Sequence, residues 1–231
     1  MFIACILILF YIMFIKISRN VLDVVIAYYN DDLKKICEYI KEVTTNQDVI
    51  VRFKVYVKST EKVEIPDNID NIEIIYLPNL GRESNTYMTY IVENYNFLPN
   101  YILFIPGKFE KHEDRILTIN KLKDLKSVTF FCGKRYNDAK SFTINKHDGV
   151  NLIPANPRGL FEWAKTYNTL KSDENKDILT GLCHSGSYLT TRDNILKRSK
   201  TFYKRILTET EIGKDTEAAH YMERLGESIY G

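Results

Sequence analysis

Residues 79–112, NLGRESNTYMTYIVENYNFLPNYILFIPGKFEKH, are the stretch of this chain that decides its fold. A polar turn that contains a glycine opens the stretch, and apolar residues then recur at the 3.6-residue spacing of a helix. The apolar run 101–105 follows and ends on Pro106-Gly107-Lys108, which is typical of a buried strand that leads into a polar loop. We therefore predict a helix and then a strand, each preceded or followed by a loop that faces one edge of a sheet.

The segments before this stretch extend the same alternation. An apolar, β-branched run at 21–27 predicts a first strand, and the polar residues 28–32 that follow it favour a turn and a helix cap. A helical stripe at 33–43 comes next, and strands are predicted at 49–57 and 72–76. This order of elements predicts an α/β domain in three layers, with a mostly parallel central sheet flanked by helices.

The C-terminal half is less regular. Short strands are predicted at 127–132 and 187–191, and helices at 159–170, 192–207 and 217–230. Residues 135–157 read as one long irregular loop, which in a compact domain is often functional.

Length and composition set the class of protein. The chain has 231 residues, of which 45% are hydrophobic and 27% charged, as in a globular protein. We predict a single α/β domain over residues 20–231. The formal net charge is only +2 and the basic residues are scattered, so no nucleic-acid partner is expected.

Residues 1–19 form a separate unit. The run 2–15 is apolar throughout, and Ile17 extends it past Lys16 to roughly 24 Å of helix, somewhat short of a bilayer core. Snorkelling by Lys16 and Arg19 can make up the difference. We predict an N-terminal hydrophobic helix that anchors the protein by a single membrane pass; a cleaved signal peptide and a buried core segment are the alternatives.

The sequence does not decide on which side of the membrane the α/β domain lies. The basic residues follow the apolar run, which favours a cytoplasmic domain, and no Asn-x-Ser/Thr acceptor occurs. Cys37, Cys132 and Cys183 are an odd number at wide spacing, so we predict neither a disulfide framework nor a zinc site.

The residues of the deciding stretch resemble a known family. The features that carry the resemblance are the Asn79-x-Gly81-Arg82-Glu83 turn, the aromatic-rich helix, Leu98-Pro99, the strand that ends at Gly107, and His112. They are similar to the family of proteins known as domain of unknown function 3431, over roughly residues 22–230. More distantly, they resemble nucleotide-sugar glycosyltransferases of the A-type fold, which implies a nucleotide sugar as donor and a glycan or glycoconjugate as acceptor.

Several residues are candidates for binding this donor. A glycine turn at a helix start suits phosphate or another anion, so Asn79, Gly81 and Arg82 are predicted to bind a diphosphate or a carboxylate, and the resemblance implies the diphosphate of the donor. The resemblance implies that Asn30 or Asp31 faces the nucleotide base, and the loop at Gly107 and Lys108 is predicted to lie at the same sheet edge. The alternative is that these residues serve only turn and capping chemistry.

Three residues are candidates for catalysis: Glu83, which would bind sugar hydroxyls, and His112 and Glu223, which would assist acid/base chemistry. A surface position for His112 and a solvated helix face for Glu217, His220 and Glu223 are the alternatives. No Asp-x-Asp pair follows strand 101–105, and Pro106 stands where the family has Gln, so no metal ligands are predicted and the need for a divalent cation is left open.

The sequence is compatible with two functions. The first is a glycosyltransferase-like enzyme that transfers a sugar from a nucleotide-sugar donor. The second is a non-catalytic, membrane-anchored module that binds glycans or is structural, with the same fold. They differ in whether Arg82, Glu83 and the Gly107 loop converge on one pocket.

Overall fold

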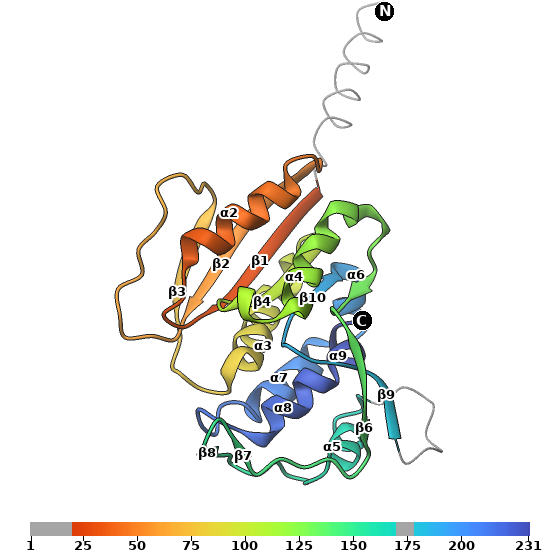
Figure 1. Ribbon diagram of the computed structural model, residues 1–231. Helices are drawn as coiled ribbons and strands as arrows, with labels where there is room; N and C mark the ends of the chain where they lie inside the picture. The colour runs from red at the N-terminus through yellow and green to blue at the C-terminus, as the bar shows by residue number, and fades with distance from the viewer. Residues whose placement is uncertain (1–19, 170–177) are drawn as a thin grey trace, which may run out of the picture.

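The computed structural model describes residues 20–169 and 178–231. Its centre is a six-stranded sheet with the order β3-β2-β1-β4-β10-β5 (Figure 1). The strands are β1 (Asn20–Tyr28), β2 (Val49–Val57), β3 (Ile72–Tyr76), β4 (Tyr101–Pro106), β5 (Phe130–Phe131) and β10 (Tyr188–Thr191). Strands β1 to β4 are parallel, whereas β10 runs antiparallel to both β4 and β5. The predicted α/β class with a mostly parallel central sheet is confirmed.

Helices cover both faces of this sheet. The helices on one face, α2 (Leu33–Thr44) and α4 (Glu113–Asn120), share an apolar cluster with alternate residues of β1 such as Val24 and Ile26. The other face carries α3 (Arg82–Asn94), α5 (Leu160–Thr166), α6 (Arg192–Leu196), α7 (Lys200–Thr208), α8 (Glu217–Arg224) and α9 (Gly226–Tyr230). Val25 faces this second cluster, as expected for a strand whose successive side chains point to opposite faces.

The part predicted as one long loop is more ordered than that. It contains β6 (Arg135–Ala139), β7 (Lys146–His147) and β8 (Val150–Asn151). Strand β6 pairs with β9 (Ile178–Cys183), and β7 pairs with β8. The prediction was wrong here because the partner of β6 lies far along the chain, and isolated polar strands carry no clear alternation. Three 3₁₀ helices, η1 (Tyr95–Phe97), η2 (Phe109–Lys111) and η3 (Lys121–Ser127), complete the connections.

The two C-terminal helical predictions each cover two helices. Segment 192–207 divides into α6 and α7, and the Ser199 hydroxyl accepts from the Phe202 N–H at the start of α7. Segment 217–230 divides at Leu225 into α8 and α9. Gly226 is the first residue of α9. A Cβ at this position would collide with the Tyr188 ring, so close packing against β10 requires glycine here.

The prediction that the cysteines form no disulfide was wrong. Cys132 and Cys183 are bonded, with a sequence separation of 51 residues, and their Cα atoms lie 5.8 Å apart. Cys37 is a free, buried thiol in the α2 core. Counting cysteines failed because one of the three packs as an apolar side chain, which leaves the other two as a pair.

The predicted membrane anchor, residues 1–19, lies outside the described residues. Among residues 20–169 and 178–231, no helix has the length and apolar character needed to cross a bilayer.

Candidate functional site

A pocket lies at the carboxyl edge of the parallel strands, between the ends of β1 and β4. Strand β1 lies between β2 and β4 in the sheet. The chain continues from β1 toward the β2 side and from β4 toward the β5 side, so the two connections diverge between β1 and β4. Such a switch point is where ligands bind in open α/β sheets. The pocket has a volume of about 260 Å³. Six of the predicted site residues line it: Asp31, Asn79, Arg82, Glu83, Gly107 and Lys108.

The turn before α3 has an unusual backbone conformation, which hydrogen bonds from Lys58 stabilise. Gly81 and Arg82 both have positive φ, of 55° and 52°. A Cβ at Gly81 would collide with Thr210, so glycine is needed both for the turn and for this packing. Lys58 stabilises the turn: its buried ammonium group donates to the Leu80 carbonyl at 2.6 Å and to the Arg82 carbonyl. Burial lowers the pKa of Lys58 to about 7, and Glu83 partly opposes this shift.

The guanidinium of Arg82 points from this turn toward two imidazoles. Its Nη1 lies 3.0 Å from Nδ1 of His147, which is in β7, and 3.4 Å from Nε2 of His220, which is in α8. Because arginine only donates hydrogen bonds, each of these contacts is a hydrogen bond in the tautomer that leaves the facing ring nitrogen unprotonated. Nδ1 of His220 lies 3.8 Å from Glu223 Oε2, and Nδ1 of His147 lies 3.3 Å from Asp148 Oδ2. Burial and the neighbouring Arg82 and His147 lower the pKa of His220 to about 4.

Glu83 and Glu223 form an electrostatically coupled pair of largely buried carboxyls. Burial raises the pKa of Glu83, but Arg82, Arg115 and His220 outweigh it, and the net shift is downward. Burial and the negative charge of Glu83 raise the pKa of Glu223 to about 7. Two carboxyls whose pKa values are driven apart are the arrangement from which acid/base roles are assigned.

The solvated face considered for the last helix is not observed. His220 is buried, Glu223 is mostly covered, and Glu217 has no exposed surface. The Glu217 carboxylate accepts hydrogen bonds from the Ile144 and Ala155 N–H groups and from Arg158 Nε, at 2.8, 3.0 and 2.9 Å. These contacts attach the 140–158 segment to α8 and so bring His147 to Arg82.

Asp31 and Gly107 meet at the opposite side of the pocket. The Gly107 N–H donates to the Ala27 carbonyl at 3.0 Å, and a Cβ on Gly107 would collide with the Asp31 carboxylate. Asp31 Oδ2 accepts from the Tyr29 N–H at 3.1 Å, whereas its buried Oδ1 has no partner among the described residues. Burial raises the pKa of Asp31, although the Tyr29 N–H and Lys108 oppose the shift. Asp31 thus lines the pocket with one carboxyl oxygen that is buried and that no described residue satisfies.

Four predicted residues do not line this pocket. Asn30 lines an adjoining pocket of about 210 Å³, together with Asp31, Gly107 and Lys108. Gly81 shapes the turn from behind, and Glu223 reaches the pocket through Glu83 and His220. His112 is exposed and precedes α4; burial of its ring and the nearby Arg115 lower its pKa.

Several residues that line the pocket were not predicted from the sequence. They are Lys58, Arg115, Lys214, Asp215 and Tyr29. Arg115 donates from Nε to the Ser185 carbonyl at 2.8 Å and from Nη1 to the Lys108 carbonyl at 2.7 Å. The loop before α8 supplies Lys214 and Asp215, and nothing local in the sequence connects that loop to the ends of β1 and β4.

The pocket is suited to an anion. Five basic and three acidic side chains line it, and two of the basic ones are guanidinium groups that can pair with phosphate oxygens. Within the described ranges, no group of three or more His, Cys, Asp or Glu side chains is arranged to hold a metal ion.

Comparison with known proteins gives one family. The family model described as "Protein of unknown function (DUF3431)" matches residues 24–231. No curated protein matches the chain. The matched range contains the whole sheet beyond the start of β1 and every residue of the pocket, so the chain belongs to the DUF3431 family.

Proposed function

We propose that this protein is a glycosyltransferase-like enzyme that transfers a sugar from a nucleotide-sugar donor to a hydroxyl of a glycan or glycoconjugate. The observation that carries the proposal is the convergence of Arg82, Glu83, Gly107 and Lys108 on one pocket at the switch point of the sheet. These residues come from two loops far apart in the sequence, and the donor-binding hypothesis required them to meet.

The donor would lie across the edge of the sheet. Tyr28 and Tyr29 offer ring surfaces at the end of β1, and the free Oδ1 of Asp31 would accept a hydrogen bond from the base or ribose. The diphosphate would lie toward Arg82, Arg115 and Lys214. In the transfer, the bond from the anomeric carbon to the phosphate oxygen breaks, and these cations would neutralise the departing diphosphate.

A carboxylate would handle the proton of the acceptor. The bond from the acceptor oxygen to the anomeric carbon forms as the hydroxyl proton leaves. Glu83 lines the pocket and its pKa is lowered, so it would be the ionised group that binds sugar hydroxyls or receives this proton. Glu223, with its raised pKa, would share the proton through the coupled pair.

Isothermal titration calorimetry with a panel of uridine and guanosine diphosphate sugars, with and without Mn²⁺, tests the proposal. Wild-type protein is expected to bind at least one donor, and Arg82→Ala to lose about 1.5 to 3 kcal/mol of that binding, as for a hydrogen-bonded charged group. Arg192→Ala is the matched control, because Arg192 follows β10 at the opposite edge of the sheet. If wild type and Arg82→Ala both fail to bind every donor, the proposal is wrong.

The second candidate is a non-catalytic glycan-binding or structural module. Pro106 in place of the family's Gln and the lack of a metal-ligand group among the described residues favour it. This module would bind glycans but show no nucleotide dependence and no transfer of labelled sugar. Either function is compatible with an anchor formed by residues 1–19, which we retain as a proposal from the sequence.

A further inference from the structure

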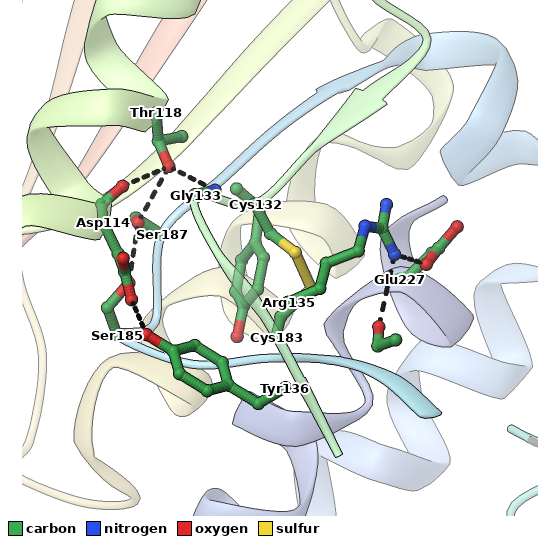
Figure 2. The surroundings of a disulfide bond; sticks show 12 residues. Asp114, Thr118, Cys132, Gly133, Arg135, Tyr136, Cys183, Ser185, Ser187 and Glu227 are labelled. Carbon is green, nitrogen blue, oxygen red and sulfur yellow. Dashed lines mark hydrogen bonds and ion pairs between the residues drawn. A yellow bond between two sulfur atoms is a disulfide. The ribbon is translucent and has the colours of Figure 1, made fainter. Parts of the chain in front are cut away.

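The disulfide joins two segments that also pair as strands, β5 with β10 and β6 with β9, and it is the covalent link between them. Cys132 follows β5, and Cys183 ends β9. Both are buried, with 2% and 0% of their surface exposed. Figure 2 shows that the bond lies beside Ser185 and Ser187, in the turn that leads from β9 into β10.

This turn packs directly against Glu83. Ser185 and Gly186 have positive φ values of 75° and 63°, a conformation that is costly for a residue with a side chain. A Cβ on Gly186 would lie 2.8 Å from Glu83 Oε1. The backbone of the turn therefore covers the Glu83 carboxylate closely. A non-glycine residue held at positive φ requires surrounding structure to keep it there.

Hydrogen bonds connect the turn to the pocket. The Ser185 carbonyl accepts from Arg115 Nε at 2.8 Å, and the same guanidinium donates to the Lys108 carbonyl at 2.7 Å. The Gly186 carbonyl accepts from the Tyr87 hydroxyl at 2.8 Å. Arg115, which itself lines the pocket, therefore joins the turn to the Gly107–Lys108 loop of the pocket.

The other end of the disulfide reaches the same turn by a second route (Figure 2). The Gly133 N–H, next to Cys132, donates to Thr118 Oγ1 at 3.1 Å, and this hydroxyl lies 3.2 Å from Ser187 Oγ. The Thr118 hydroxyl donates to the Asp114 carbonyl at 2.8 Å. Both cysteines are thus coupled to the position of Ser185–Ser187, one covalently and one through α4.

We propose that the Cys132–Cys183 disulfide is a positioning element of the anion site, which holds the Ser185–Ser187 turn against Glu83 and Arg115, so that the site is complete only in the oxidised protein. The proposal deepens the proposed function, and it relies on that function only for the identity of the ligand. Forming the bond removes two electrons and two protons from the two thiols. A disulfide of the compartment, in a protein or a small molecule, would take them up.

Reduction of the folded full-length protein tests the proposal. Dithiothreitol supplies two electrons and two protons and becomes the cyclic disulfide, leaving two thiols. Two variants provide the same comparison without a reductant: Cys132→Ala with Cys183→Ala, and Cys37→Ala as the control that leaves the bond intact. Inorganic pyrophosphate is the probe, because it carries the charge of the diphosphate without the nucleotide.

We expect the oxidised protein and the Cys37→Ala control to bind pyrophosphate equally, and the reduced protein and the double variant to bind it about tenfold more weakly. Hydrogen exchange followed by mass spectrometry should show faster exchange of the 184–187 amides in the reduced form. Far-ultraviolet circular dichroism should be unchanged, which shows that the reduced protein is still folded. The 184–187 amides should gain more in exchange rate than the β2 and β3 amides do, which distinguishes a local effect from the general loss of stability.

Each result decides the proposal. Alkylation of Cys132 and Cys183 in the folded, non-reduced protein would overturn it, and so would equal exchange of the turn in both forms. If pyrophosphate binds as expected but no nucleotide sugar does, the positioning role stands and the proposed function fails. If no form binds pyrophosphate, or if the oxidised and reduced forms bind it equally, the positioning proposal fails.

Discussion

Lys58 and Arg82 show how the candidate site depends on single residues placed against their usual preferences. Lys58 is 7% exposed, although lysine is seldom buried without partners, and Arg82 has a positive φ that arginine rarely adopts. The two features support each other, because the Lys58 ammonium group donates to the carbonyls of Leu80 and Arg82. The direction of the Arg82 guanidinium therefore depends on a lysine at the end of β2.

We expect Lys58→Met to disrupt this turn while keeping the length of the side chain. The partly buried Leu80 and Arg82 carbonyls would lose their donor, which should cost about 1 to 3 kcal/mol of the free energy of unfolding. Pyrophosphate affinity should fall about tenfold as Arg82 loses its orientation. Urea denaturation and calorimetry measure the two effects. The exposed Lys62→Met is the control, and equal behaviour of the two variants would contradict the role given to Lys58.

At the level of elements, the site depends on how the last helices and the 140–158 segment pack onto α3. Helix α8 supplies His220 and Glu223 to the Arg82 side of the pocket, and Glu217 holds the segment that carries His147. The break between α8 and α9 lets Gly226 approach Tyr188 of β10. The single continuous helix that was predicted over 217–230 did not indicate that glycine is needed at position 226.

Gly226→Ala is expected to destabilise the protein, the reverse of what helix propensity predicts. Propensity alone favours Ala over Gly by about 1 kcal/mol within a helix. Here the added Cβ would collide with the fully buried Tyr188 ring, and overpacking of this kind typically costs about 1 to 3 kcal/mol. Thermal denaturation measures the difference, with Ser228→Ala in the same helix as the control. An increase in melting temperature for Gly226→Ala would contradict the packing described.

Glu217→Gln should have an effect on stability that depends on pH. Burial raises the pKa of Glu217. Hydrogen bonds from Arg158 and from the Ile144 and Ala155 N–H groups lower this pKa by more than burial raises it, so the net shift is downward. The stabilisation is therefore fully present above the unfolded-state pKa of the carboxyl and is lost as the pH falls through the lower folded-state value.

At pH 7 the Glu217→Gln variant is expected to be less stable than wild type by about 1.5 to 3 kcal/mol, the range for hydrogen bonds to a charged group. The difference should shrink as the pH falls below the ordinary glutamate pKa of about 4.3, and it should vanish once the carboxylate of the folded wild type is protonated. Urea unfolding at several pH values measures it. Glu162→Gln, at an exposed position in α5, should show no difference at any pH, and a pH-independent cost for Glu217→Gln would contradict the assigned charge.

At the level of the whole molecule, the disulfide and the N-terminal segment decide where this protein can work. A bond between Cys132 and Cys183 is typical of proteins that fold in an oxidising compartment. The basic residues after the apolar run had favoured a domain on the cytoplasmic side. Together with an anchor at residues 1–19, the disulfide favours the opposite orientation, with the α/β body outside the cytosol.

Reduction is expected to lower the overall stability substantially. For a loop closed by cysteines 51 residues apart, the chain-entropy relation gives about 4 kcal/mol. The urea midpoint of the reduced protein should fall by the corresponding amount, and that of Cys132→Ala with Cys183→Ala should fall similarly. The Cys37→Ala variant should respond to reductant as the wild type does. No change on reduction would mean that the bond adds nothing to the stability of the fold.

The full chain is expected to sediment with membranes and to resist carbonate extraction, because a run of apolar residues without a polar face requires lipid or a deep core around it. A chain that lacks residues 1–19 should remain folded and stay in the supernatant. Circular dichroism and sedimentation of both forms measure this. If the deletion unfolds the α/β body, the segment belongs to the core and the anchor proposal is wrong.

Local patterns determined the sheet and one side of the site. Periods of two and 3.6 residues identified β1 to β4 and the two helices between them, because each of these elements buries one continuous apolar face. Their order predicts a parallel sheet, and a parallel sheet brings the ends of its strands to one edge. Asp31, Arg82, Glu83 and Lys108 were therefore predictable as neighbours before their distances were known.

The tertiary structure alone decided the remainder. The pocket is lined from separate parts of the chain by Lys58, Arg115 and Lys214, and no spacing in the sequence relates them. His147 reaches Arg82 from yet another segment. The pairing of Cys132 with Cys183 depends on the fold of β5 and β9 around the same turn, not on how many cysteines the chain has. The physical reason is common to both cases: periodicity reports which face of an element is buried, whereas a site is made where different elements meet.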